Sequence, residues 1–188
     1  MDNEVSAGST ASTSTLGTLA LGLTLLAIGI GHTGVISGVA ATDAASLATY
    51  IGGVALFVLG VLEFRGGNGF NGTAFAGAGA FFFTWSTGDG NASAHAAGLF
   101  LLLFALFALT LTLAAPSGLF GQGTYALLFL SLLLTGIGAY AGTSALVKAG
   151  GWVAVVTGLL AWYGATAALA NWPTAVGRTS RRGAVAAS

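Results

Sequence analysis

Long apolar runs with almost no charged residues in them fill most of this 188-residue sequence. Hydrophobic residues make up 55% of the chain and charged residues only 5%, whereas an ordinary soluble domain has about 25% charged residues. A helix needs about 20 consecutive apolar residues to cross a bilayer, so the length allows roughly six crossings and little else. The sequence therefore predicts an all-α integral membrane protein with six transmembrane helices.

Polar residues, glycine and proline divide the apolar sequence into the six expected spans. These lie at residues 16–39, 47–64, 73–85, 94–115, 125–147 and 150–171. They form one transmembrane domain over residues 15–171. The Ser- and Thr-rich residues 1–14 and the basic residues 172–188 have too little apolar surface to pack, so both are expected to be disordered tails.

The basic residues predict how the protein is oriented, because Lys and Arg near span ends are retained on the cytoplasmic side. An even number of spans places both termini on the same side. Cytoplasmic termini leave only Lys148 outside and put the other basic residues inside, namely Arg65, Arg178, Arg181 and Arg182. We therefore expect a multi-pass protein of the cell membrane with both termini in the cytoplasm.

Glycines are abundant, with 31 in the chain, and small residues let helices approach closely in lipid. Gly52, Gly53 and Gly60 recur at the same offsets in the sixth span, as Gly150, Gly151 and Gly158. This match suggests repeated helical hairpins. In a chain so rich in Gly, Ala and Leu a chance match is the alternative, and the sequence leaves both open.

The most informative segment, residues 63–75, interrupts the apolar sequence with four glycines. Asn71 or Thr73 can cap the third span, whose exposed N–H groups and positive dipole end form a seat for a carboxylate. Asn68 can add an amide donor. The alternative is an ordinary tight turn in which Glu63 and Arg65 are merely solvated.

Residues 63–75 read Glu-Phe-Arg-Gly-Gly-Asn-Gly-Phe-Asn-Gly-Thr-Ala-Phe and are followed by Gly79-Ala80-Phe81. This segment resembles the signature of the acetate uptake transporter family of acetate and succinate permeases, Glu-Phe-Arg-x-Gly-Asn-Thr-Phe-Gly-x-Thr-Ala-Phe. Only Gly69 and Asn71 depart from it. The predicted anion seat and the motif together comprise six residues: Glu63, Arg65, Asn68, Phe70, Asn71 and Thr73.

The resemblance implies transport of acetate, succinate or another short carboxylate through a channel-like or proton-coupled pathway within each protomer. It also implies a homo-oligomer, a hexamer, embedded in the lipid bilayer. In the family a narrow constriction lies on the first, third and fifth spans, and matching motifs carry its positions onto Leu21, Ala78 and Leu128.

Two departures from the family pattern bear on transport. Of the family's Asn-Pro-Ala-Pro-Leu-Gly motif only Leu16-Gly17 is present, after Ser12-Thr13-Ser14-Thr15, and Ala78 stands where the family has a Tyr. A wider pore, a different gate and loss of transport are the alternatives that follow.

Other chemistry finds little support. The chain has no cysteine, and its two histidines lack neighbouring carboxylates, so no metal site or cofactor is expected. The net charge is zero and the basic residues form no interior cluster, so no nucleic-acid partner is expected. No nucleophile with a base, or acid pair, is placed for catalysis, so an enzyme is not expected. A non-transporting membrane scaffold or sensor of the same fold is the competing function.

Polar residues inside the spans need hydrogen-bond partners, because lipid offers none. Four threonines are expected to bond back to carbonyls of their own helices: Thr24, Thr110, Thr135 and Thr157. His32 either lines the pathway and titrates near neutral pH or is a plain interfacial residue.

Overall fold

Every regular element in the described part of the chain is a helix. The structure, a computed structural model, describes residues 2–88, 92–116 and 118–172. Its α-helices are α1 (Asp2–Thr33), α2 (Ala41–Ala48), α3 (Leu56–Arg65), α4 (Gly69–Gly88), α5 (Ala94–Ala114), α6 (Thr124–Tyr140) and α7 (Ser144–Leu169). Two π-helical segments, η1 (Thr49–Ala55) and η2 (Leu119–Gly123), lead directly into α3 and α6. The predicted all-α class is confirmed.

Five helical stretches of the described residues are long and apolar enough to cross a membrane. They are Thr13–Thr33, Ala41–Arg65, Ala94–Ala114, Leu119–Tyr140 and Ser144–Leu169. The 20-residue α4 is outside this set because Asn71, Thr73 and several glycines dilute its apolar residues. The chain is a multi-pass membrane protein. Most of the predicted C-terminal tail, including its three arginines, lies outside the described residues.

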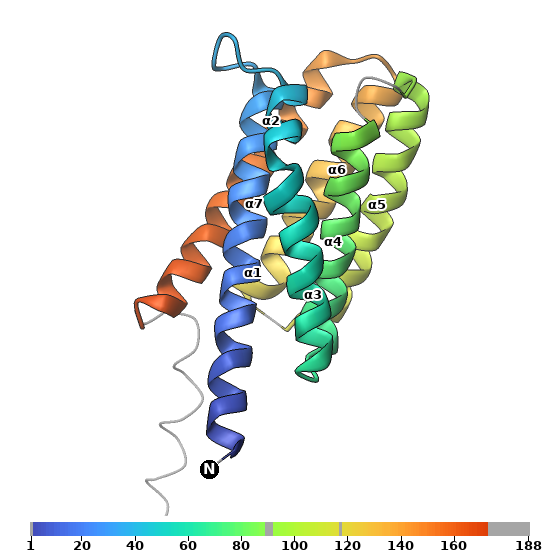
Figure 1. Cartoon of the computed structure of the whole chain (residues 1–188). Coiled ribbons are helices and arrows are strands. Elements are labelled where there is room, and N and C mark those ends of the chain that lie inside the picture. Colours follow the sequence, from blue (N-terminus) through green and yellow to red (C-terminus); the bar gives the residue numbers. More distant parts are fainter. Residues whose placement is uncertain (1, 89–91, 117, 173–188) are drawn as a thin grey trace, which may run out of the picture.

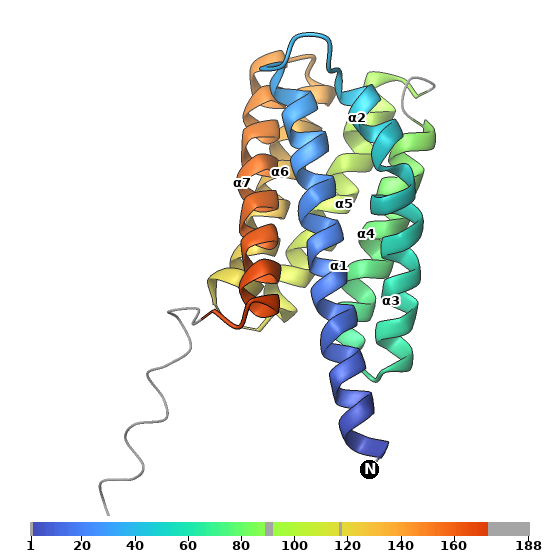
Figure 2. The same ribbon diagram turned by 60° about the vertical axis from the view of Figure 1, so that its left-hand side comes forward.

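The long helices form a closed ring in which chain neighbours pack side by side (Figures 1 and 2). α1 packs against α2 and α3, α3 against α4, α5 against α6, and α6 against α7. α4 touches α5 more sparsely, and α7 returns to α1 to close the ring. The hydrophobic core lies inside this ring.

Glycine pairs bring α1 and α7 into backbone contact. A Cβ on Gly22 would lie 3.0 Å from the Gly158 carbonyl oxygen, and one on Gly29 would lie 2.9 Å from that of Gly151. These two contacts are seven residues apart on each helix, so they fall on one face of antiparallel helices. The expectation that Gly151 marks a closely packed face is therefore met by the local geometry.

Several helix boundaries differ from the predicted ones. α1 extends back to Asp2, into residues 1–14 expected to be a tail, and it ends at Thr33 rather than at residue 39. Gly34 follows with a φ of 67°, a left-handed conformation that stops the helix. The fifth span ends at Tyr140 rather than at residue 147, because Gly142 (φ 64°) forms the turn into α7.

Candidate functional site

One face of α1 lines the interior of the ring. Ser14, Thr18, Leu21, Leu25, Ile28 and His32 recur every three or four residues, which places them in one stripe along the helix. Ser14 and Thr18 line one cavity, and Leu25, Ile28 and His32 line a second. The buried Leu21 lies between the two groups.

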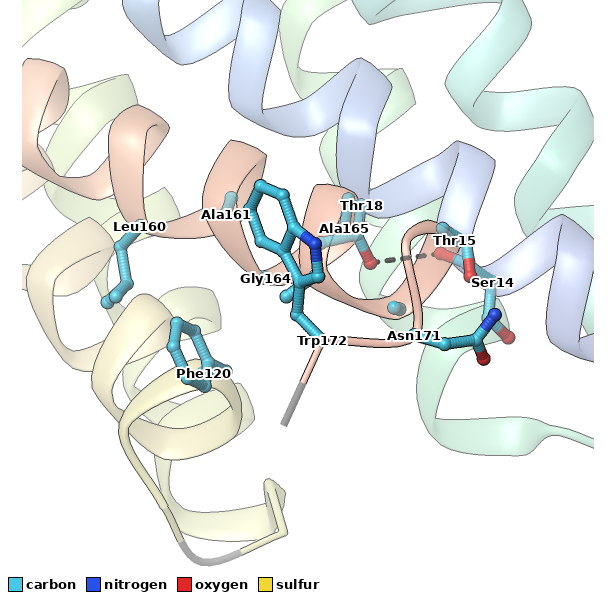
Figure 3. A pocket seen from close by; sticks show the side chains of 12 residues that line it. Ser14, Thr15, Thr18, Phe120, Leu160, Ala161, Gly164, Ala165, Asn171 and Trp172 are labelled. Atoms are coloured by element: carbon cyan, nitrogen blue, oxygen red, sulfur yellow. Dashed lines mark hydrogen bonds between the residues drawn. The ribbon is translucent and has the colours of Figure 1, made fainter. Parts of the chain in front are cut away.

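The first cavity, here called the vestibule, has a volume of about 550 Å³ (Figure 3). Its walls come from the start of the α1 stripe, from Phe120 of η2 and from small residues of α7, and Asn171 and Trp172 lie at the end of α7. None of the described residues lining it is charged. Thr18 Oγ1 donates to the Ser14 carbonyl oxygen at 2.9 Å. The vestibule thus offers hydroxyl and amide groups rather than a full charge.

The second cavity, the central cavity, has a volume of about 40 Å³. Roughly 10–15 Å³ on this scale holds one water molecule, so the space suits a group of about three heavy atoms. Its polar lining is His32, Ser131 and Thr135, and the rest is apolar apart from the indole N–H of Trp85. Ser131 Oγ donates to the Gly150 carbonyl oxygen at 2.8 Å, so that hydroxyl proton is already engaged.

The three predicted constriction residues lie in one core cluster between the ring's helices. Leu21, Ala78 and Leu128 are 2%, 7% and 6% exposed. Leu128 also lines the central cavity, whereas Leu21 and Ala78 line neither cavity. The structure therefore brings these residues together, and their role in selecting substrates stays a prediction.

The space beside Ala78 is not open. A Tyr-to-Ala change frees a volume on the order of 100 Å³ unless neighbours fill it, yet the nearby central cavity has only about 40 Å³. Phe75 and Phe82 are buried in the same core cluster. Phe81 belongs to this cluster as well, and its ring packs toward α5, 4.7 Å from that of Phe104 between centroids. Repacked aromatic side chains thus occupy much of the ring's interior near Ala78.

The signature segment forms a polar cluster with Ser14 of α1, here called the Ser14 cluster. Glu63, at 1% exposure, accepts a 2.8 Å hydrogen bond from Ser14 Oγ. Ser14 Oγ in turn accepts from Asn71 Nδ2 at 3.0 Å and from Asn68 Nδ2 at 3.4 Å. Asn68 Oδ1 caps α4 by accepting from the Asn71 backbone N–H. The alternative of a solvated Glu63 is therefore wrong, because these residues enclose its carboxyl group.

The remaining predicted seat residues lie around this cluster rather than in it. Arg65 and Thr73 are exposed, and Thr73 Oγ1 donates to the Gly69 carbonyl oxygen at 2.8 Å. The ring of Phe70 meets that of Tyr125 edge to face, at 5.4 Å between centroids. Phe70 thereby links the start of α4 to the start of α6, one turn from Leu128.

Sequence reasoning missed Ser14 and Tyr125. Ser14 falls in a stretch with no apolar signal, although its spacing to Leu21, Leu25 and His32 could have revealed a common face. Tyr125 is 7% exposed and stands three residues before Leu128, so the same spacing argument applies to α6.

The expectation for the intramembrane threonines holds only in part. Thr110 and Thr157 donate to the carbonyl oxygens of Leu106 and Val153, at 3.0 and 2.7 Å. Thr24 Oγ1 is buried with no hydrogen-bond partner. It packs against η1, where a Cβ on Gly52 would lie 2.7 Å from that oxygen. At Thr24, therefore, close packing of α1 against η1 replaces the expected hydrogen bond.

Comparison with known proteins assigns the chain to a family. Residues 3–176 match the family model described as the GPR1/FUN34/yaaH family. The chain belongs to this family. The resemblance inferred from the signature segment is thereby confirmed. The fold is similar to that of a solved structure titled "Structure of the bacterial acetate channel SatP", with a TM-score of 0.74 and 25% sequence identity. The match covers 85% of this chain and 92% of that chain. No curated protein matches the sequence.

Proposed function

We propose that this protein conducts acetate and other short carboxylates across the cell membrane. The observation that carries the proposal is the likeness to a bacterial acetate channel over most of both chains. The arrangement of the interior supports it, because the vestibule, the core cluster around Leu21 and the central cavity follow one another along α1.

The groups that line the vestibule suit weak binding and fast passage of an anion. An anion in the vestibule would meet hydroxyl groups, amide groups and an indole rather than Lys or Arg. Such donors stabilise a carboxylate without holding it tightly, which a channel requires because the ion must leave as readily as it enters. Channel-like conduction is therefore our preferred mechanism over a proton-coupled carrier.

The Ser14 cluster changes what we propose for the anion seat at the start of α4. Asn68 and Asn71 direct their amide groups at Ser14 Oγ, and Ser14 directs its proton at Glu63. In this arrangement Ser14 Oγ accepts the Asn68 amide hydrogen bond that the seat would offer to a substrate carboxylate. We propose that the cluster sets the position of α1 beside the vestibule.

We further propose that α4 also crosses the membrane, as the third of six spans, and that helical hairpins repeat around the ring. The glycine contacts support a repeat. Gly53 and Gly60 closely approach α4, the next helix in the ring. In the same way, Gly151 and Gly158 of α7 closely approach α1, which follows α7 in the ring. The other two glycines of the match contact the span that precedes their own in the ring: Gly52 packs on α1, and Gly150 packs on α6. A repeat about the ring axis would produce this equivalence.

The remaining features of the proposal follow the distribution of basic residues and, for the assembly, the family resemblance. Both termini are cytoplasmic, as the distribution of Lys and Arg favours. The protein assembles as a homohexamer with one pathway in each protomer, and it acts as a conduit rather than as an enzyme.

Flux into liposomes tests the proposal. Purified protein reconstituted into vesicles should accelerate uptake of labelled acetate over protein-free vesicles, and lactate and succinate should define the size range. Acetate uptake equal to that of empty vesicles, from protein shown to be folded and inserted, would favour the scaffold or sensor function instead.

A further inference from the structure

The His32 imidazole is a titratable group at the central cavity, and the packing of the apolar core does not require a titratable group at that position. It lies in the last turn of α1, is half-buried and lines the cavity. Its Nδ1 is 2.9 Å from the Ile28 carbonyl oxygen. A carbonyl oxygen can only accept, so Nδ1 carries the proton of this bond. Nε2 is therefore the nitrogen whose protonation state can change.

The base of the His32 side chain packs against α7, because a Cβ on Gly151 would lie 2.8 Å from His32 Cβ. The ring itself is held by the Nδ1 bond to the Ile28 carbonyl oxygen. Such a held ring is the arrangement expected of a binding group rather than of a freely solvated histidine.

The electrostatic surroundings leave His32 as the sole source of charge at the cavity. No other residue lining it, within the described chain, is titratable in the physiological range. On the elements packed against this end of α1, Asp43 of α2 and Lys148 of α7 are exposed, and neither lines the cavity. A proton on Nε2 would therefore create a positive charge in a small and mostly apolar space.

We propose that His32 is the carboxylate-binding residue of the central cavity and that it binds in its imidazolium form, which rests on the proposed function of carboxylate conduction. The cavity matches a carboxylate group in size, and the apolar side chains of Leu25, Ile28 and Leu132 suit a short alkyl chain. The Nε2–H group of the imidazolium donates to one carboxylate oxygen.

The sign of the pH dependence follows from the two states of Nε2. With Nε2 protonated, the imidazolium attracts the anion and donates a charge-assisted hydrogen bond to it. With Nε2 unprotonated, its lone pair faces the carboxylate oxygens and repels them. Because histidine is the side chain that changes charge near physiological pH, we expect acetate binding to weaken about tenfold from low to high pH.

Acetate currents in planar bilayers test this inference, because current reports the anion and excludes diffusion of the neutral acid. The half-saturating acetate concentration is measured from about pH 5.5 to about pH 8 for the wild type, His32→Gln and His95→Gln. His95 is the matched control, since it is the other histidine of the chain and its ring contacts Tyr140 instead, at 5.0 Å between centroids. We expect the roughly tenfold pH dependence in the wild type and in His95→Gln, and a flat profile in His32→Gln.

A second measurement does not depend on conduction. In ¹⁵N spectra of detergent-solubilised protein, acetate should shift the His32 imidazole resonances at low pH and leave those of His95 unchanged. A wild-type current whose pH profile survives in His32→Gln would overturn the His32 assignment while sustaining the proposed function. A specific His32 shift without any acetate current would sustain the binding site and overturn conduction. Equal shifts of both histidines would overturn the binding site.

Discussion

Ser14 Oγ donates a 2.8 Å hydrogen bond to Glu63 Oε1 and so joins two helices across 49 residues of sequence. Glu63 is 1% exposed, and its other oxygen, Oε2, is buried with no hydrogen-bond partner. Ser14 is therefore the sole side chain bonded to this carboxyl group among the described residues. α1 is thus tied at Ser14, beside the vestibule, to the last turn of α3.

Replacing Ser14 by Ala should destabilise the protein. The change leaves Glu63 without any donor and removes the acceptor of two asparagine amides, which costs about 1–3 kcal/mol for a buried group. Thermal unfolding in detergent should show a lower midpoint. Thr18→Ala is the control, because it deletes a hydroxyl from the same vestibule whose bond is to its own helix. Equal midpoints for the two variants would contradict a structural role for the Ser14 bond.

Replacing Glu63 by Gln should be tolerated. The amide oxygen of Gln can still accept from Ser14, and the change removes any cost of an ionised oxygen that has no buried partner. Glu63→Leu keeps the volume but removes the acceptor, so it leaves the Ser14 hydroxyl proton without its acceptor. Unfolding midpoints at neutral pH should follow the order Gln equal to or above wild type, and Leu below both. A Gln variant as unstable as the Leu variant would mean that the negative charge itself is required.

Replacing Gly151 by Ala should separate α1 from α7. The added methyl would lie 2.8 Å from His32 Cβ and 3.0 Å from the Gly29 carbonyl oxygen, and the backbone atom cannot rotate away. Overpacking of this kind costs typically about 1–3 kcal/mol. Gly69→Ala is the control, because nothing lies within 4 Å of its added methyl. Folded yield and unfolding midpoint should fall only for Gly151→Ala, and an unaffected Gly151→Ala would refute the close approach.

Individual residues show which features of the structure can be predicted from the sequence and which cannot. The positions of the long helices follow from apolar runs, and the interior position of Leu21 and Leu128 follows from a family motif. The burial of Glu63 could not be predicted in this way, because its partner Ser14 lies in a Ser- and Thr-rich stretch with no pattern that indicates contact with a distant acid. The turn at Gly142 was equally hidden, since the surrounding residues are apolar enough to continue a span.

Replacing Leu21 by Ala should connect the vestibule with the central cavity. Leu21 is 2% exposed and lies one turn from both Thr18 and Leu25, which line the two spaces. The lost packing costs about 2–5 kcal/mol, so correct folding is checked first by gel filtration. Butyrate uptake should then rise relative to acetate uptake. Leu23→Ala removes the same atoms from an exposed position on the same helix, and it should leave the ratio unchanged.

Replacing Ala78 by Tyr should suppress large substrates first. Ala78 is 7% exposed within the core cluster and lines neither cavity, so a phenol ring there must displace neighbours into the pathway. Initial uptake of butyrate should therefore fall more than that of acetate. Taking the ratio of the two rates cancels differences in protein amount.

Ala80→Tyr is the control for this variant, because the same ring is added to an exposed position on the opposite side of α4. The butyrate-to-acetate ratio should fall for Ala78→Tyr and stay at the wild-type value for Ala80→Tyr. A ratio that is unchanged in folded Ala78→Tyr protein would place the selective constriction elsewhere. The edge-to-face pair of Phe70 and Tyr125 would then be the next position to examine, because it spans the ring one turn from Leu128.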